Sequence, residues 1–151
     1  MIQRKQTLYF LAALVLNVIC LCLPIGSVEP HGMGVSPLFY NLGLQDGNGG
    51  IGIKTIPLFI ALLLTSPLTV LAIFQYHRRK LQMRLCEGCI LLCGAWHVCF
   101  VFYWLNDLSQ LGTFHVTPAT FLPFIAIVFF ALAHKGIRAD EKLLKATDRI
   151  R

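Results

Sequence analysis

Three cysteines in one stretch of the chain have the residue type and spacing for redox or metal chemistry. Cys86 and Cys89 form a C-x-x-C pair, and Cys93 follows at the next helical repeat. In a helix these spacings place the three side chains on one face. Membrane oxidoreductases that pass electrons between thiols and a quinone need a reactive pair on the oxidising side. A structural zinc site needs a fourth ligand.

The basic residues before this pair indicate that it faces the reducing side of a membrane. Four cations lie between positions 78 and 84, and cationic flanks of membrane helices stay in the cytoplasm. The connections predicted on the other side contain no cysteine. We interpret Cys86, Cys89 and Cys93 as small packing residues and keep a thiol or metal redox protein as the third functional hypothesis.

Four polar residues near the middle of apolar stretches form a candidate polar layer: Asn17, Thr65, Ser66 and His97. At 1.5 Å per residue they lie within a few ångströms of the same depth. One interpretation is a hydrogen-bonded layer that fixes helix packing, at about 0.6 kcal/mol per contact. The other is a small-molecule or proton site, opened by a kink at Pro67.

Other chemistries of small membrane proteins lack the residues that they require. Glu87 lies near the basic rim, where we expect it to pair with Arg84. No second histidine reaches the depth of His97 to hold a haem, and the first stretch has no carboxylate of the kind that proton-coupled exporters use. There is also no H-E-x-x-H or phosphate-loop motif. The sequence thus predicts no catalytic residue, cofactor or metal.

Four apolar stretches position all of these residues, at about 7–25, 55–75, 85–105 and 118–134. Each is close to the roughly 20 residues that a helix needs to cross a bilayer. An apolar fraction of 56% with 13% charged residues is unusual for a soluble domain. The sequence predicts an all-α membrane protein, one domain over residues 1–151, with four transmembrane helices.

The lysines and arginines predict the orientation of these helices. There are thirteen, and only Lys54 lies between the first and second or the third and fourth stretches. Because cationic segments stay inside, we expect both termini to be cytoplasmic. We attribute the net charge of +6 to this topology and to anionic lipid head groups as partners, and expect no nucleic acid.

The sequence also predicts structure in two segments outside the apolar stretches. The Gly-rich outer loop, residues 26–54, contains two β-prone runs at 38–44 and 51–53, which predict a hairpin packed on the helix ends. In the cytoplasmic tail, residues 135–151, apolar residues recur at helical spacing: Ala139, Leu143, Ala146 and Ile150. We expect an amphipathic helix lying on the membrane face or against the cytoplasmic loop.

The ends of the chain carry a resemblance to a known family. The opening MIQRKQTLY and the closing DEKLLKATDRIR are similar to an uncharacterised domain-of-unknown-function family of bacterial four-helix membrane proteins, found mainly in Bacteroidetes. The resemblance implies a multi-pass protein of the bacterial inner membrane and no assigned activity. Because the shared motifs are cytoplasmic, the candidate partner or lipid contacts are Arg78, Arg79, Lys80, Asp148 and Arg149.

The leading functional hypothesis is a non-enzymatic scaffold or accessory subunit of a membrane complex, with another membrane protein as its partner. The absence of catalytic groups, together with structured segments on both sides, motivates it. The alternative is a small-molecule transporter or binder that uses the polar layer.

Overall fold

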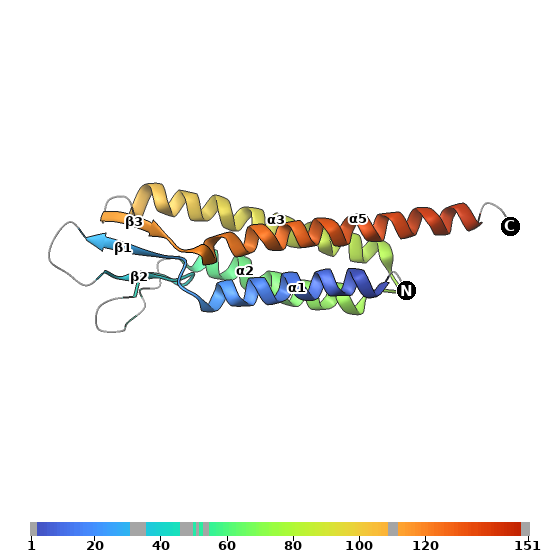
Figure 1. Cartoon of the computed structure of the whole chain (residues 1–151), viewed down its shortest axis with the longest axis horizontal. Coiled ribbons are helices and arrows are strands. Elements are labelled where there is room, and N and C mark those ends of the chain that lie inside the picture. Colours follow the sequence, from blue (N-terminus) through green and yellow to red (C-terminus); the bar gives the residue numbers. More distant parts are fainter. Residues whose placement is uncertain are drawn as a thin grey trace.

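The computed structural model describes residues 3–30, 36–45, 50, 52, 55–108 and 112–148. Four helices run side by side along its long axis (Figure 1): α1 (Gln3–Cys22), α2 (Ile56–Phe74), α3 (Arg79–Tyr103) and α5 (Leu122–Asp148). All four are long and apolar enough to cross a membrane. The helical bundle predicted from the apolar stretches is therefore confirmed, and it is compatible with a multi-pass membrane protein.

A small antiparallel sheet covers one end of the bundle, here called the sheet end (Figure 1). Its strands are β1 (Gly26–Pro30), β2 (Leu38–Phe39) and β3 (Gly112–Val116), in the order β2-β1-β3. A π-helical turn, η1 (Trp104–Leu108), precedes β3, and a 3-10 turn, η2 (Pro118–Phe121), joins β3 to α5. Both termini lie at the opposite end, here called the basic end (Figure 1).

The strand pairing differs from the predicted hairpin. The run that begins at Leu38 pairs with β1, through Gly26 with Phe39 and Ser27 with Leu38. Between the two runs of the predicted hairpin, the described residues show the hydrogen bond from Gly52 N to Leu44 O, at 2.8 Å; Ile51 and Ile53 lie outside the described residues. The second long connection supplies β3, which pairs with all five residues of β1. A third strand explains the difference, because an isolated hairpin is marginal in water.

The tail also differs from its prediction, because α5 continues without a break from the fourth apolar stretch to Asp148. The helix runs past the ends of the other three (Figure 1), whereas we expected a separate helix on the membrane face or against the cytoplasmic loop. Gly136 does not interrupt it. A Cβ at Gly136 would lie 3.3 Å from Cγ of Gln6, so the glycine allows α1 and α5 to approach closely. Packing against α1 therefore keeps α5 helical beyond the predicted end of the span.

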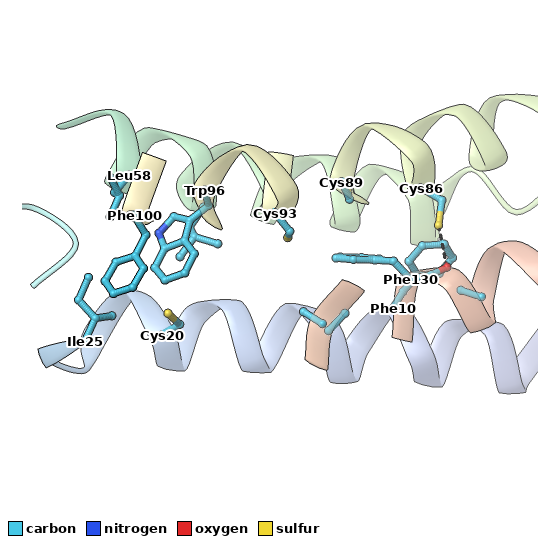
Figure 2. Packing of buried hydrophobic residues seen from close by; sticks show 14 of the residues in the cluster. Phe10, Cys20, Ile25, Leu58, Cys86, Cys89, Cys93, Trp96, Phe100 and Phe130 are labelled. Carbon is cyan, nitrogen blue, oxygen red and sulfur yellow. Dashed lines mark hydrogen bonds between the residues drawn. The ribbon is translucent and has the colours of Figure 1, made fainter. Parts of the chain in front are cut away.

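The interior of the bundle is built around one face of α3. Its buried residues recur three and four positions apart, as a helix face requires: Gln82, Cys86, Cys89, Cys93, Trp96 and Phe100. Facing them are Phe10 and Cys20 from α1, Leu58 from α2 and Phe130 from α5 (Figure 2). Thus α2 and α5 pack directly onto α3, whereas α1 packs on α2 and α5 and faces α3 across the bundle.

Asn41, from the connection after β2, ties this interior to the sheet end. Its Nδ2 donates to Cys20 O at 2.6 Å, and its Oδ1 accepts from Trp96 Nε1 at 2.8 Å. Its backbone oxygen accepts from Thr55 Oγ1 at 3.1 Å. The side chain is fully buried. One residue therefore links the end of α1, the middle of α3 and the start of α2.

Replacing Asn41 by leucine should destabilise the protein. The change leaves the buried Trp96 N–H without its acceptor, which costs about 1–3 kcal/mol in the free energy of unfolding. Asn106→Leu is the control, because Asn106 is exposed and donates only to Phe102 O of its own helix end. Its effect should stay within about 0.5 kcal/mol. Unfolding in detergent micelles, followed by tryptophan fluorescence, measures both; equal effects would contradict the role given to Asn41.

Candidate functional site

Three helices share a buried polar contact at the centre of the bundle. Asn17 Nδ2 of α1 donates to Thr65 Oγ1 of α2 at 3.1 Å and to Cys93 Sγ of α3 at 3.7 Å. Thr65 Oγ1 itself donates to Leu62 O at 2.6 Å. Asn17 and Thr65 are both fully buried. The structure therefore brings these two residues of the predicted polar layer together, with Cys93 as a third member.

Ser66 lies beside this contact but does not join it. Among the described residues, neither Ser66 Oγ nor Asn17 Oδ1 has a hydrogen-bond partner. Around the proline at position 67, the threonine hydroxyls bond carbonyls of their own helix, Thr69 Oγ1 donating to Thr65 O at 2.6 Å. These bonds satisfy the threonine hydroxyls within α2.

The three cysteines share one face of α3, as predicted, but contact three different helices (Figure 2). Cys86 Sγ donates to Phe130 O of α5 at 3.0 Å, Cys89 Sγ lies 3.6 Å from Thr69 Oγ1 of α2, and Cys93 accepts from α1 as described. All three are fully buried. In the described part of the chain, no group of three or more His, Cys, Asp or Glu side chains is arranged to hold a metal ion. The geometry is that of packing residues bonded to their neighbours.

His97 is separate from the other polar residues of the predicted layer. Its Nδ1 is 2.8 Å from Cys93 O, and because a carbonyl only accepts, Nδ1 carries the proton in this contact. The ring lies edge-on to Phe124 of α5, with centroids 6.2 Å apart. It lines a groove between α3 and the start of α5. Counting residues predicted the depth of His97 in the bilayer, whereas the packing of the helices decides which way its side chain points.

Glu87 pairs across helices, not along its own. Its Oε1 is 3.1 Å from His134 Nε2 of α5, whereas we expected an ion pair with Arg84. The carboxylate is more than half exposed, so the pair adds little stability. His134 could not be foreseen as the partner, because the residues are 47 positions apart.

The basic end holds a contact that sequence reasoning missed. Gln6 of α1, which is buried, donates through Nε2 to Asp140 Oδ2 of α5 at 2.6 Å. Both residues line one small recess with Arg79 and Gln82 of α3. Gln6 belongs to the opening motif and Asp140 to the closing one, so the two end motifs meet in space. The sequence did contain a signal for this contact, because both end motifs resemble the same family.

The structure describes some of the remaining candidate contact residues at this end. Arg78 and Lys80 are exposed and Arg79 is partly buried; Arg79 and Lys80 begin α3, six residues before the predicted start of the span at 85. Asp148 ends α5, and Arg149 lies outside the described residues. No catalytic arrangement follows from these side chains.

Buried and exposed cysteines should differ in reactivity. A polar maleimide should label Cys22, which is exposed at the end of α1, and spare Cys20, Cys86, Cys89 and Cys93, which are buried. The rates should differ by roughly a hundredfold or more, because a buried thiol reacts only after local opening that costs a few kcal/mol. Mass spectrometry of digested protein after timed labelling measures the rates. Labelling of Cys86 or Cys89 as fast as Cys22 would contradict their assignment as packing residues.

Substitutions of Asn17 should show whether the central polar contact serves packing. Asn17→Leu loses two weak contacts of about 0.6 kcal/mol each but also removes a buried oxygen without a partner. The net change in unfolding free energy should stay within about 1 kcal/mol. Asn17→Asp keeps the size of the side chain but buries a charge. It should lower the free energy of unfolding by more than about 2.5 kcal/mol. Equal tolerance of both variants in micelle unfolding would show that water or a ligand reaches this position.

Comparison with known proteins places the chain in one family. The model of one family, described as Domain of unknown function (DUF4293), matches residues 2–150. No curated protein matches the chain, and no solved structure does. The predicted resemblance to an uncharacterised domain family is thereby confirmed. The chain belongs to the DUF4293 family, whose model covers both end motifs and all four helices.

Proposed function

We propose that the protein is a non-enzymatic scaffold or accessory subunit of a complex in the bacterial inner membrane. It would span the bilayer four times with both termini in the cytoplasm. The charge pattern supports this orientation, because the sheet end carries few cations and the basic end carries exposed Arg78 and Lys80. The resemblance of the chain ends to bacterial proteins supports the inner membrane.

The use of the interior for packing supports a non-enzymatic role. The central amide of Asn17 and the three thiols of α3 each bond a neighbouring helix. Such contacts fix how helices pack. A bound substrate would have to compete with them for the same atoms. The side chains that a partner could contact are therefore those on the surface of the molecule.

The continuation of α5 is the observation that carries the proposal. The helix runs beyond the other three at the basic end (Figure 1) and ends only at Asp148. Along this extension Leu144 is 49% exposed, and the cations Arg138 and Lys142 are exposed on other sides of the helix. A helix with exposed apolar and basic side chains suits a groove or an acidic face of another protein.

Native mass spectrometry of the tagged full chain, gently extracted from its own membranes, tests the proposal. We expect a second polypeptide at fixed stoichiometry. Leu144→Glu should lower its occupancy roughly tenfold, since placing a charge in an apolar contact costs about 1.4 kcal/mol or more. Leu81→Glu is the matched control: Leu81 is 38% exposed at the same end of the bundle but lies on α3.

The outcomes separate a docking helix from a passive one. Loss of the second polypeptide in Leu144→Glu, with retention in Leu81→Glu, is the expected result. A protein that runs alone at its own mass would contradict the accessory-subunit role. Retention of the partner in both variants would show that α5 is not the surface that holds it.

A further inference from the structure

Packing of the described residues leaves a groove beside His97 unfilled. It has a volume of about 450 Å³ and lies between the sheet-end half of α3 and the segment that leads from β3 into α5. One wall is formed by His97, Phe100, Val101 and Trp104; the other is formed by Val116, Thr120, Phe121 and Phe124. Several of these residues are open to the surroundings, Phe124 being 58% exposed.

Two of the polar groups in the walls are already engaged. Thr120 Oγ1 donates to Ile25 O at 2.7 Å, and His97 Nδ1 is bonded to Cys93 O. The other six lining residues are apolar or aromatic. No charged side chain lines the groove. A polar or ionic ligand would therefore find little to recognise, whereas a hydrocarbon would lose nothing on entering.

The position and size of the groove decide which hydrocarbon it suits. His97 and Trp104 are seven residues apart, so the groove is about 10 Å long at 1.5 Å per residue. A packed α-helix has a diameter of about 10–12 Å and over that length would need roughly 800 Å³, more than the groove provides. In a bilayer, this stretch of α3 runs from the middle of the hydrocarbon to the interface at which tryptophans gather. Lipid chains surround the protein at that depth.

We propose that this groove is a binding site for a single hydrocarbon chain of a membrane lipid. The chain lies along α3 with its end near His97 and leaves the groove beside Trp104, toward the head groups at the sheet end. Phe121 and Phe124 cover it from the side of α5. The site rests on the membrane topology proposed above, but not on the accessory-subunit role.

Photolabelling in vesicles tests the site. The full chain is reconstituted in phosphatidylcholine and phosphatidylglycerol with a trace of phosphatidylcholine that carries a diazirine at mid-chain. After irradiation, labelled residues are mapped by mass spectrometry. Val101, Phe121 and Phe124 should carry roughly ten times the label of Leu63, as about 1.4 kcal/mol of preferential binding produces. Leu63 is the internal reference, since it is 47% exposed near the middle of α2.

Two substitutions on α3 sharpen the test. Val101→Trp fills the groove and should reduce its labelling to the level of Leu63. Val98→Trp is the matched control, because Val98 is 72% exposed on the same helix and does not line the groove; it should leave the pattern unchanged. Size-exclusion chromatography verifies that both variants fold. Should Val101→Trp not fold, the distribution of label over the unmodified chain decides.

Each result bears on the proposal. Even labelling of the groove and Leu63 would overturn the site while leaving the membrane topology in place. Groove labelling that persists in folded Val101→Trp would also overturn it. Absence of label from all four helices would overturn both the site and the proposed topology. Label concentrated in the groove and abolished by Val101→Trp supports a bound chain.

Discussion

The hydrogen bonds of Asn41 tie three helices together through one buried residue of a loop. Its side chain accepts from Trp96 Nε1 and donates to Cys20 O, while its backbone accepts from Thr55. A buried indole N–H needs an acceptor, and the apolar interior offers few. Because Asn41 supplies it from the loop, the described residues next to Asn41 are anchored against α3. β1 and β3 then complete a sheet over the same end of the bundle.

Different kinds of contact stabilise the two ends of the bundle. At the sheet end, buried aromatic and amide groups meet, and Phe39 packs edge-on against Phe114 at 5.9 Å between centroids. At the basic end, the close approach of α1 and α5 at Gly136 brings Gln6 to Asp140. That contact directs α5 along α1. The shape proposed to meet a partner is therefore a consequence of helix packing.

The interior and the surface divide the functional hypotheses between them. The side-chain nitrogen of Asn17, Thr65 and the cysteines of α3 bond one another or the backbone, whereas Asn17 Oδ1 has no partner among the described residues. His97 points instead to a groove at the bundle surface. The residues once grouped as one polar layer thus belong to two places with different surroundings. Both proposals therefore place the functional contacts on the surface of the bundle.

The sequence alone determined the number of helices, their approximate bounds and the shared face of Cys86, Cys89 and Cys93. Those properties depend on local hydropathy and on a fixed helical repeat, which are readable along the chain. The tertiary structure decided what each face meets. It separated His97 from Asn17, gave Glu87 to His134, recruited β3 into the sheet and kept α5 straight to Asp148. These outcomes depend on the rotation and approach of helices, which contacts between distant residues set and which no local pattern encodes.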